Sequence, residues 1–291
     1  MTNEKQIDVI WFPTYRCNLK CPQCAARKLP IFSAKEIPYT EWITIFKNQN
    51  IRKMTISGRE PFLFKGLLDV MNTLPNCEFH IESNLLLDMD KIIKPIKPKV
   101  TVVGTCHFAP GTKNYNKFIK NAKLLKANGF NIGIKYDMLA SKGGMSEKFW
   151  EADKEKLVED LKDVGVWHRY SGFDDMLLFN NYLIYGGSTK QCRFGYSHIT
   201  ISPDGRVFRC TGHIYQNILC MGDLKVNKIN ELMFKSVQPC KNAACTCAIQ
   251  EGKEYDNKIV ALAVKKIDIK SITPQYYYLI SKDKMPDSFK E

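Results

Sequence analysis

Residues 7–24 read IDVIWFPTYRCNLKCPQC, an apolar run followed by three closely spaced cysteines. The run IDVIWF is apolar at every position but one, which is typical of a strand in a parallel sheet that is covered on both faces. Cys17, Cys21 and Cys24 follow it in a C-x3-C-x2-C arrangement. The stretch therefore predicts a buried strand whose following loop carries three thiols to one end of a sheet.

Short apolar runs alternate with amphipathic stretches as far as about residue 170. The segment 115–129 shows the helical pattern most clearly, since its apolar residues recur at i, i+3, i+7 and i+10. The further predicted strands are 53–57, 78–83, 99–105, 131–137 and 164–170, and the predicted helices are 39–48, 66–74, 89–96, 115–129 and 147–165.

Six strand and helix alternations predict a parallel α/β sheet that is either doubly wound or curled into a partial barrel. A closed eight-stranded barrel would need two more units. The character of the sequence changes after about residue 185: HITISPDGRVFRC, residues 198–210, predicts a hairpin that turns at Asp204-Gly205, and six cysteines gather in this part of the chain. We therefore predict a barrel domain over 1–185, a smaller cysteine-rich domain over 186–250, and a tail over 251–291 that docks or acts as a lid.

Composition restricts the setting of the protein. The N-terminus shows no signal-peptide pattern and no apolar run is long enough to span a membrane, so we expect a cytoplasmic protein without a membrane partner. Eleven cysteines in a reducing compartment indicate metal binding rather than disulfides. The net charge of +13 favours an anionic partner or reflects the habit of the source genome, and it does not specifically indicate nucleic acid.

The first cysteine group has the chemistry of an incomplete metal site. Three nearby thiolates can ligate three irons of a [4Fe–4S] cluster, whereas a structural zinc would need a fourth Cys or His, and residues 8–40 contain none. The fourth iron of such a cluster is left open to a small molecule.

Two further motifs make the sequence resemble the radical S-adenosylmethionine (SAM) enzymes. C-x3-C-x2-C after the first strand is the signature of that family, SGREP resembles its GGEP motif, and Ser83-Asn84 lies where the family often has Thr-Asn-Gly. The resemblance implies a partial (β/α)6 TIM-like barrel, in which the cluster on Cys17, Cys21 and Cys24 cleaves SAM to a 5′-deoxyadenosyl radical. It also implies that SAM is bound by Ser57, Gly58, Arg59, Glu60, Pro61, Ser83 and Asn84.

The sequence departs from the family pattern at two positions. Arg59 replaces the usual second glycine of the GGEP motif, and Gln23 stands where an aromatic residue often stacks on adenine. The adenine contact by way of position 23 therefore stays unassigned, and at position 59 a side chain stands where close backbone approach is usual. The alternative interpretation of the first half is an ordinary α/β domain with a cysteine-rich loop.

The second cysteine group resembles the SPASM or shorter twitch domain of these enzymes. Its first half, C-x(9–15)-G-x4-C, is matched in full, and its second half has fewer cysteines than SPASM. The resemblance implies an auxiliary [4Fe–4S] cluster on four of five cysteines: Cys192, Cys210 and Cys245, with Cys240 or Cys247. Cys220 could compete, and a zinc ribbon built from the same thiolates is the alternative.

Other residues follow the later strands. His107, after the fourth strand, is a candidate proton relay or substrate contact, or a structural residue. Tyr136 and Asp137 at the fifth strand, and 167–169 on the sixth, also point toward the expected site. Cys77 is expected to be a small core residue.

The function implied by the resemblance is hydrogen-atom abstraction from a substrate carbon by a radical SAM enzyme. The auxiliary cluster would transfer electrons or hold the substrate, and an external flavodoxin or ferredoxin would supply the reducing electron. We expect a small anionic metabolite, sugar or nucleotide as substrate. The alternatives are a peptide-modifying enzyme and, in another class, a non-catalytic iron–sulfur electron carrier or scaffold.

Overall fold

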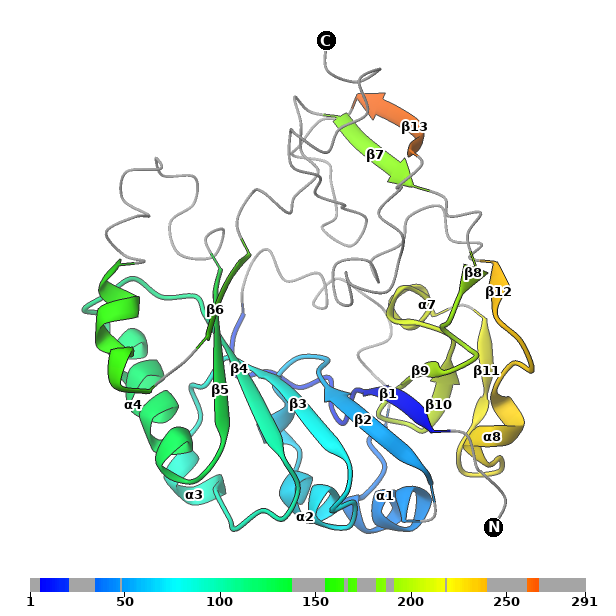
Figure 1. Cartoon of the computed structure of the whole chain (residues 1–291), viewed down its shortest axis with the longest axis horizontal. Helices are drawn as coiled ribbons and strands as arrows, with labels where there is room; N and C mark the ends of the chain where they lie inside the picture. The colour runs from blue at the N-terminus through cyan, green and yellow to red at the C-terminus, as the bar shows by residue number, and fades with distance from the viewer. Residues whose placement is uncertain are drawn as a thin grey trace.

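The structure is a computed structural model that describes residues 6–20, 35–47, 49–137, 155–164, 167–171, 182–186, 191–217, 219–239 and 261–266. Its main element is a nine-stranded sheet in the order β11-β10-β9-β1-β2-β3-β4-β5-β6. Strands β1 to β6 are parallel to one another, and the sheet runs as an arc from β6 to β11 (Figure 1). These strands are β1 Ile7–Trp11, β2 Ile51–Ile56, β3 Glu78–Ser83, β4 Val100–Cys106, β5 Asn131–Asp137 and β6 Trp167–Ser171. The predicted partial barrel is confirmed.

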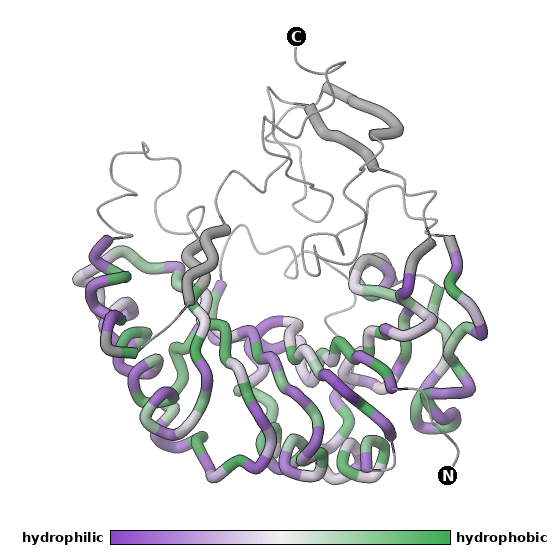
Figure 2. The backbone as a smooth tube through the Cα atoms, in the orientation of Figure 1, coloured by the Kyte–Doolittle hydropathy of each residue, from purple (hydrophilic) through white to green (hydrophobic). Residues whose placement is uncertain are grey.

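The helices lie along one side of this sheet (Figure 1). They are α1 Tyr39–Phe46, α2 Leu67–Asn72, α3 Met89–Ile92 and α4 Lys113–Ala127, with short 3-10 turns η3 Pro61–Leu63 and η4 Lys162–Val164. Residues 155–160 are also helical, within the predicted helix 147–165, whose first part lies outside the described residues. The helical segments carry both hydrophobic and hydrophilic residues, as expected when one face packs and the other is exposed (Figure 2).

Helix α3 is shorter than predicted. The pattern indicated a helix over 89–96, but α3 ends at Ile92 and Ile93 is extended, with φ −63° and ψ 130°. Pro95 follows two residues later. Because a proline disfavours helical conformation in the residue before it and has no N–H to donate, the helix ends early.

The core lies between the helices and one face of the sheet. Trp11 of β1 is fully buried, and its ring meets those of Trp42, Phe46 and Phe64 edge-on, with centroids 5.2, 5.3 and 5.7 Å apart. Ile7 and Val9 belong to the same cluster. Because side chains of a strand alternate between its faces, Asp8 and Ile10 lie on the opposite face.

A hairpin extends the sheet beyond β1. Strands β9 His198–Ile201 and β10 Arg206–Phe208 are antiparallel, and the turn between them includes Gly205 with φ +90°, so the predicted hairpin is confirmed. β9 pairs in parallel with β1, and β11 Cys220–Asp223 completes the edge. Helices α7 Thr211–Gln216 and α8 Ile229–Leu232 follow β10 and β11.

A buried acid joins β1 to both of its neighbours. Asp8 accepts hydrogen bonds from the Arg52 guanidinium of β2, and His198 Nε2 of β9 lies 3.2 Å from Asp8 Oδ2. Burial of Asp8 opposes its ionisation, but the hydrogen bonds and charges of His198 and Arg52 outweigh burial and hold the pKa of Asp8 below its usual 3.8. The hairpin is thus attached to the barrel by backbone pairing and by the contact between His198 and Asp8.

Two small sheets complete the described chain. β8 Gln191–Cys192 pairs with β12 Gln238–Pro239, and β7 Tyr182–Gly186 pairs with β13 Ala261–Lys266 at the top of Figure 1. The tail segment therefore returns to the stretch that precedes the second cysteine group. Within the described residues, no helix has the length and apolar character needed to cross a membrane.

Candidate active site

The motifs of the first half follow successive parallel strands. Cys17 lies six residues beyond β1, Ser57 follows β2 directly, and Ser83 ends β3 with Asn84 next to it. Because the carboxyl ends of parallel strands share one edge of a sheet, these residues meet at that edge.

The segment after β2 packs closely against the end of β1. Ser57 N donates to the Trp11 carbonyl at 3.0 Å, and Ser57 Oγ donates to Glu82 Oε2 at 2.6 Å. Gly58 has φ +113°, and a Cβ at this position would lie 3.0 Å from the Thr14 carbonyl. Arg59 is not one of the described non-glycine residues that have a positive φ. The turn therefore needs glycine at position 58 and accepts a side chain at position 59.

Glu60 is the internal acceptor of the site. Its carboxylate is fully buried and accepts from Ser83 Oγ and Asn84 N, both at 2.9 Å, and from Phe62 N at 3.3 Å. Burial raises the pKa of Glu60 from 4.5 to about 7, although the three hydrogen bonds act in the opposite direction. The side chain of Glu60 thus fixes the backbone after β3. The backbone N–H of Glu60 donates to the Arg16 carbonyl at 3.2 Å.

Asn84 links this unit to the first cysteine. Its Nδ2 lies 2.8 Å from Asn18 Oδ1 and 3.9 Å from Cys17 Sγ, while its Oδ1 accepts from Leu86 N at 3.0 Å. Asn84 is buried, with 6% of its surface exposed. The structure therefore brings Cys17, Glu60, Ser83 and Asn84 into one hydrogen-bonded unit.

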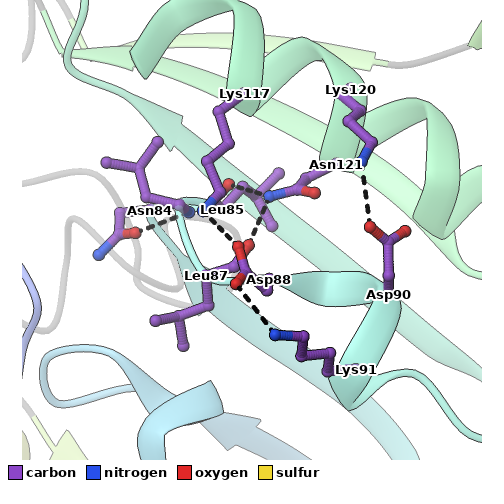
Figure 3. A network of polar contacts seen from close by, with 10 residues as sticks. Asn84, Leu85, Leu87, Asp88, Asp90, Lys91, Lys117, Lys120 and Asn121 are labelled. Carbon is purple, nitrogen blue, oxygen red and sulfur yellow. Dashed lines mark hydrogen bonds and ion pairs between the residues drawn. The ribbon is translucent and has the colours of Figure 1, made fainter. Parts of the chain in front are cut away.

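Helix α4 braces the loop that carries Asn84 (Figure 3). Asn121 is buried on the sheet-facing side of α4, and its Nδ2 donates to the carbonyls of Leu85 and Leu87 at 2.7 and 2.8 Å. Leu85 has φ +54°, a left-handed conformation that these contacts hold in place. Further out, Lys117 pairs with Asp88 at 2.6 Å.

A salt bridge joins the residues that flank the three cysteines in the sequence. Arg16, directly before Cys17, donates from Nε and Nη2 to the two carboxylate oxygens of Glu36, both at 2.9 Å, and from Nη2 to the Leu63 carbonyl at 2.9 Å. Thr14 Oγ1 also donates to Glu36. Because Cys17, Cys21 and Cys24 all lie between Arg16 and Glu36, we name this pair the loop clasp.

The donor set around Cys17 fits a metal-bound thiolate. Its sulfur receives the backbone N–H of Leu19 at 3.4 Å, in addition to the Asn84 amide, and Asn18 Oδ1 lies 4.0 Å from the same sulfur. N–H donors of this kind are compatible with thiolate ligands of an iron–sulfur cluster. Cys21 and Cys24 lie outside the described residues, and the described part of the chain contains no group of three or more His, Cys, Asp or Glu that could hold a metal ion.

The second cysteine group is described in part. Cys210 is buried, with 3% of its surface exposed, directly before α7, and the backbone of Cys192 pairs with Gln238 in the β8–β12 ladder. Buried Arg209 donates to the carbonyls of Phe194 at 2.9 Å and Gln238 at 2.7 Å, which ties β10 to β12. Cys240, Cys245 and Cys247 lie outside the described residues.

The remaining predicted positions lie on or after other strands, or in the core. His107 follows β4, and its ring packs edge-on against Phe108. Residues 136–137 and 167–169 lie on β5 and β6, paired in one ladder. Cys77 is buried in the core, as predicted, and burial raises the pKa of its thiol to about 12. Cys220 is exposed on edge strand β11.

Several residues of the site were not found from the sequence. Asn18, Glu36 and Asn121 belong to none of the sequence motifs described above. For Asn121 a signal existed, because it lies between Phe118 and Ala122 on the apolar face of α4, where a polar residue calls for an internal partner. The loop clasp joins positions 20 residues apart in no regular pattern.

Comparisons with known proteins concern the fold. No protein-family model matches the sequence, and a search of curated proteins finds no significant match. Among solved structures, three of SuiB from Streptococcus suis are similar: SuiB alone (TM-score 0.51, 14% identity), SuiB bound to S-adenosylmethionine (0.51, 16%) and SuiB bound to the precursor peptide SuiA (0.50, 15%). The matches cover 79% of this chain and 66, 64 and 65% of the SuiB chains, so this chain spans just under two thirds of their length. The chain therefore shares the fold of SuiB.

Proposed function

We propose that the protein is a radical SAM enzyme that abstracts a hydrogen atom from a substrate carbon. The observation that carries the proposal is the hydrogen-bonded unit of Cys17, Glu60, Ser83 and Asn84. Three segments that resemble three motifs of one family, and that lie far apart in the sequence, meet there at the carboxyl edge of a parallel sheet. The shared fold with a SAM-bound SuiB structure is consistent with it.

Cys17, Cys21 and Cys24 would hold the cluster, and SAM would complete its coordination. When bound, the cluster supplies the electron that cleaves SAM, a chemistry that no side chain of the chain can provide. The chain's own residues position this pair: the loop clasp joins the residues that flank the three cysteines, Glu60 fixes the β3 end, and the backbone of residues 57–61 is the proposed contact of the SAM amino group.

We propose that Cys192, Cys210 and Cys245, with Cys240 or Cys247, hold an auxiliary [4Fe–4S] cluster. The β8–β12 pairing supports this, because it places Cys192 opposite Gln238, two residues before Cys240 in the sequence. Cys210 follows Arg209, which bonds to the same β12 strand. The cluster would transfer electrons or hold the substrate, and a flavodoxin or ferredoxin would deliver the reducing electron.

The substrate that we favour is a small anionic metabolite, sugar or nucleotide, in keeping with the net charge of +13. A peptide is the second candidate, and the SuiB structure bound to its precursor peptide favours it. Stimulation of 5′-deoxyadenosine formation by a panel of nucleotides and sugar phosphates, compared with a panel of short peptides, separates the two.

Iron and sulfide content per chain tests the cofactor assignment. We expect about eight irons in the anaerobically reconstituted protein and about four in the Cys17→Ala, Cys21→Ala, Cys24→Ala triple variant. Cys77→Ala is the matched control, because it removes a buried thiol that the proposal does not use, and its iron content should equal that of the wild type. Equal iron in the triple variant, or zinc in place of iron, would contradict the proposal.

A further inference from the structure

The side-chain amide of Asn84 has one defined orientation. Its Oδ1 accepts from Leu86 N at 3.0 Å, and its Nδ2 faces Asn18 Oδ1 at 2.8 Å. A rotation by 180° would place an NH2 group against the Leu86 N–H and an oxygen against the Asn18 oxygen. Both contacts would be repulsive, so the hydrogen-bond network assigns oxygen and nitrogen without ambiguity.

The second N–H of this amide is directed at sulfur. Asn84 Nδ2 lies 3.9 Å from Cys17 Sγ, and the Leu19 backbone N–H approaches the same atom at 3.4 Å. The backbone of Asn84 is fixed as well, because its N–H donates to the fully buried Glu60. Asn18 therefore orients the amide, and the Glu60 framework sets its distance from the sulfur.

We propose that Asn18 and Asn84 act as a pair of positioning residues that keep an N–H donor on the Cys17 sulfur and thereby raise the reduction potential of the cluster bound there. This inference rests on the proposed function, since it assumes the cluster. Reduction adds negative charge to the cluster and its thiolates, and a donor on a ligand sulfur stabilises that added charge. Loss of the donor should make the cluster harder to reduce.

The test is the midpoint potential of the cluster in reconstituted full-length protein, followed by electron paramagnetic resonance during a redox titration. The relevant signal is the one that disappears in the Cys17→Ala variant. Asn84→Asp is nearly isosteric, keeps an oxygen for the Leu86 N–H, and replaces the donor with an anionic oxygen. We expect a lower midpoint potential with iron content unchanged.

A matched control and a second variant complete the design. Asn72→Asp makes the same chemical change at an asparagine whose Oδ1 accepts from Lys97 N at 2.9 Å and whose Nδ2 donates to the Pro95 carbonyl at 3.1 Å, at the end of α2. Its potential should equal that of the wild type. Asn18→Ala leaves the Leu86 and Glu60 contacts of Asn84 intact and should lower the potential in the same direction by a smaller amount. Combined with Asn84→Asp, it should add less than its single effect, because both act through one contact.

The outcomes separate the two proposals. A wild-type protein without a Cys17-dependent iron signal contradicts the proposed function. If that signal is present and Asn84→Asp shows the wild-type potential, the inference is overturned while the function stands. Should Asn84→Asp fail to retain iron, Asn18→Ala decides: a lowered potential supports the inference, and an unchanged potential overturns it.

Discussion

The backbone N–H of Asn84 donates to Oε2 of Glu60 at 2.9 Å, and this bond joins the residue after β3 to the segment after β2. Because the backbone N–H of Glu60 in turn donates to the Arg16 carbonyl, the segments after three successive strands are connected through this one buried residue. The geometry at Cys17 therefore depends on a residue that lies beneath the proposed site and is fully buried.

Ionisation of Glu60 should make stability fall with rising pH. The pKa of Glu60 is raised from 4.5 to about 7 in the folded protein, so between these values the folded state binds more protons than the unfolded state. Stability from this group is complete below pH 4.5 and is lost as pH rises to about 7, a change of ~3 kcal/mol.

The measurement compares urea unfolding of the wild type and Glu60→Gln across this pH window. Glu60→Gln cannot ionise, so the difference between the two free energies should change by ~3 kcal/mol between pH 4.5 and 7. Other titrating groups cancel in the difference. Parallel curves throughout the window would contradict the prediction.

Gly58 should be intolerant of a side chain. Gly58→Ala combines φ +113° with a Cβ placed 3.0 Å from the Thr14 carbonyl, and we expect it to lower the free energy of unfolding by ~3 kcal/mol. Gly111→Ala is the control, because Gly111 has φ +82° and no atom within 4 Å of an added Cβ. It carries the conformational cost alone, ~1 kcal/mol. If urea unfolding gave similar losses of unfolding free energy for both variants, the close approach at Gly58 would not contribute to stability.

The loop clasp should slow the loss of iron. Arg16→Ala and Glu36→Ala each remove the bidentate pair that flanks the three cysteines, and we expect either variant to release iron to a chelator about two- to fivefold faster, as befits a partly exposed pair. The double variant should show less than the sum of the two single effects, because the bidentate pair is lost in both single variants. Asp69→Ala removes the exposed pair between Asp69 of α2 and Lys94, which follows α3, and should leave the rate unchanged. Additive effects of the two clasp variants would indicate that the residues act separately.

The parallel α/β sheet could be predicted from the sequence because apolar runs and helical periodicity are local signals. These signals fit a doubly wound sheet as well as a partial barrel, and the resemblance to the radical SAM enzymes favoured the barrel. The hairpin at residues 198–210 could be predicted for the same reason, since Asp204-Gly205 specifies a turn. The pairing of this hairpin with β1 could not be predicted, because Ile10 and Thr200 are neighbours in the sheet but 190 positions apart in the chain. No local pattern encodes such a contact.

Part of the candidate site could likewise be predicted from local sequence signals, and part could not. Cys17 and the SGREP segment stand out by spacing and residue type, whereas the direction of a side chain depends on packing. The inward carboxylate of Glu60 and the amide of Asn84 facing sulfur follow from burial and from the hydrogen bonds around them. The roles of Asn18 and Glu36 depend on contacts between segments that are distant in the sequence, so they could not be predicted from it.

The most direct test of the account is chromatography for 5′-deoxyadenosine after anaerobic incubation of the reconstituted protein with SAM and dithionite. The account predicts that the wild type forms it and that Cys17→Ala does not, while Cys77→Ala forms it at the wild-type rate. A wild-type protein that binds iron and forms no 5′-deoxyadenosine would contradict the enzymatic role and would favour an electron carrier or scaffold.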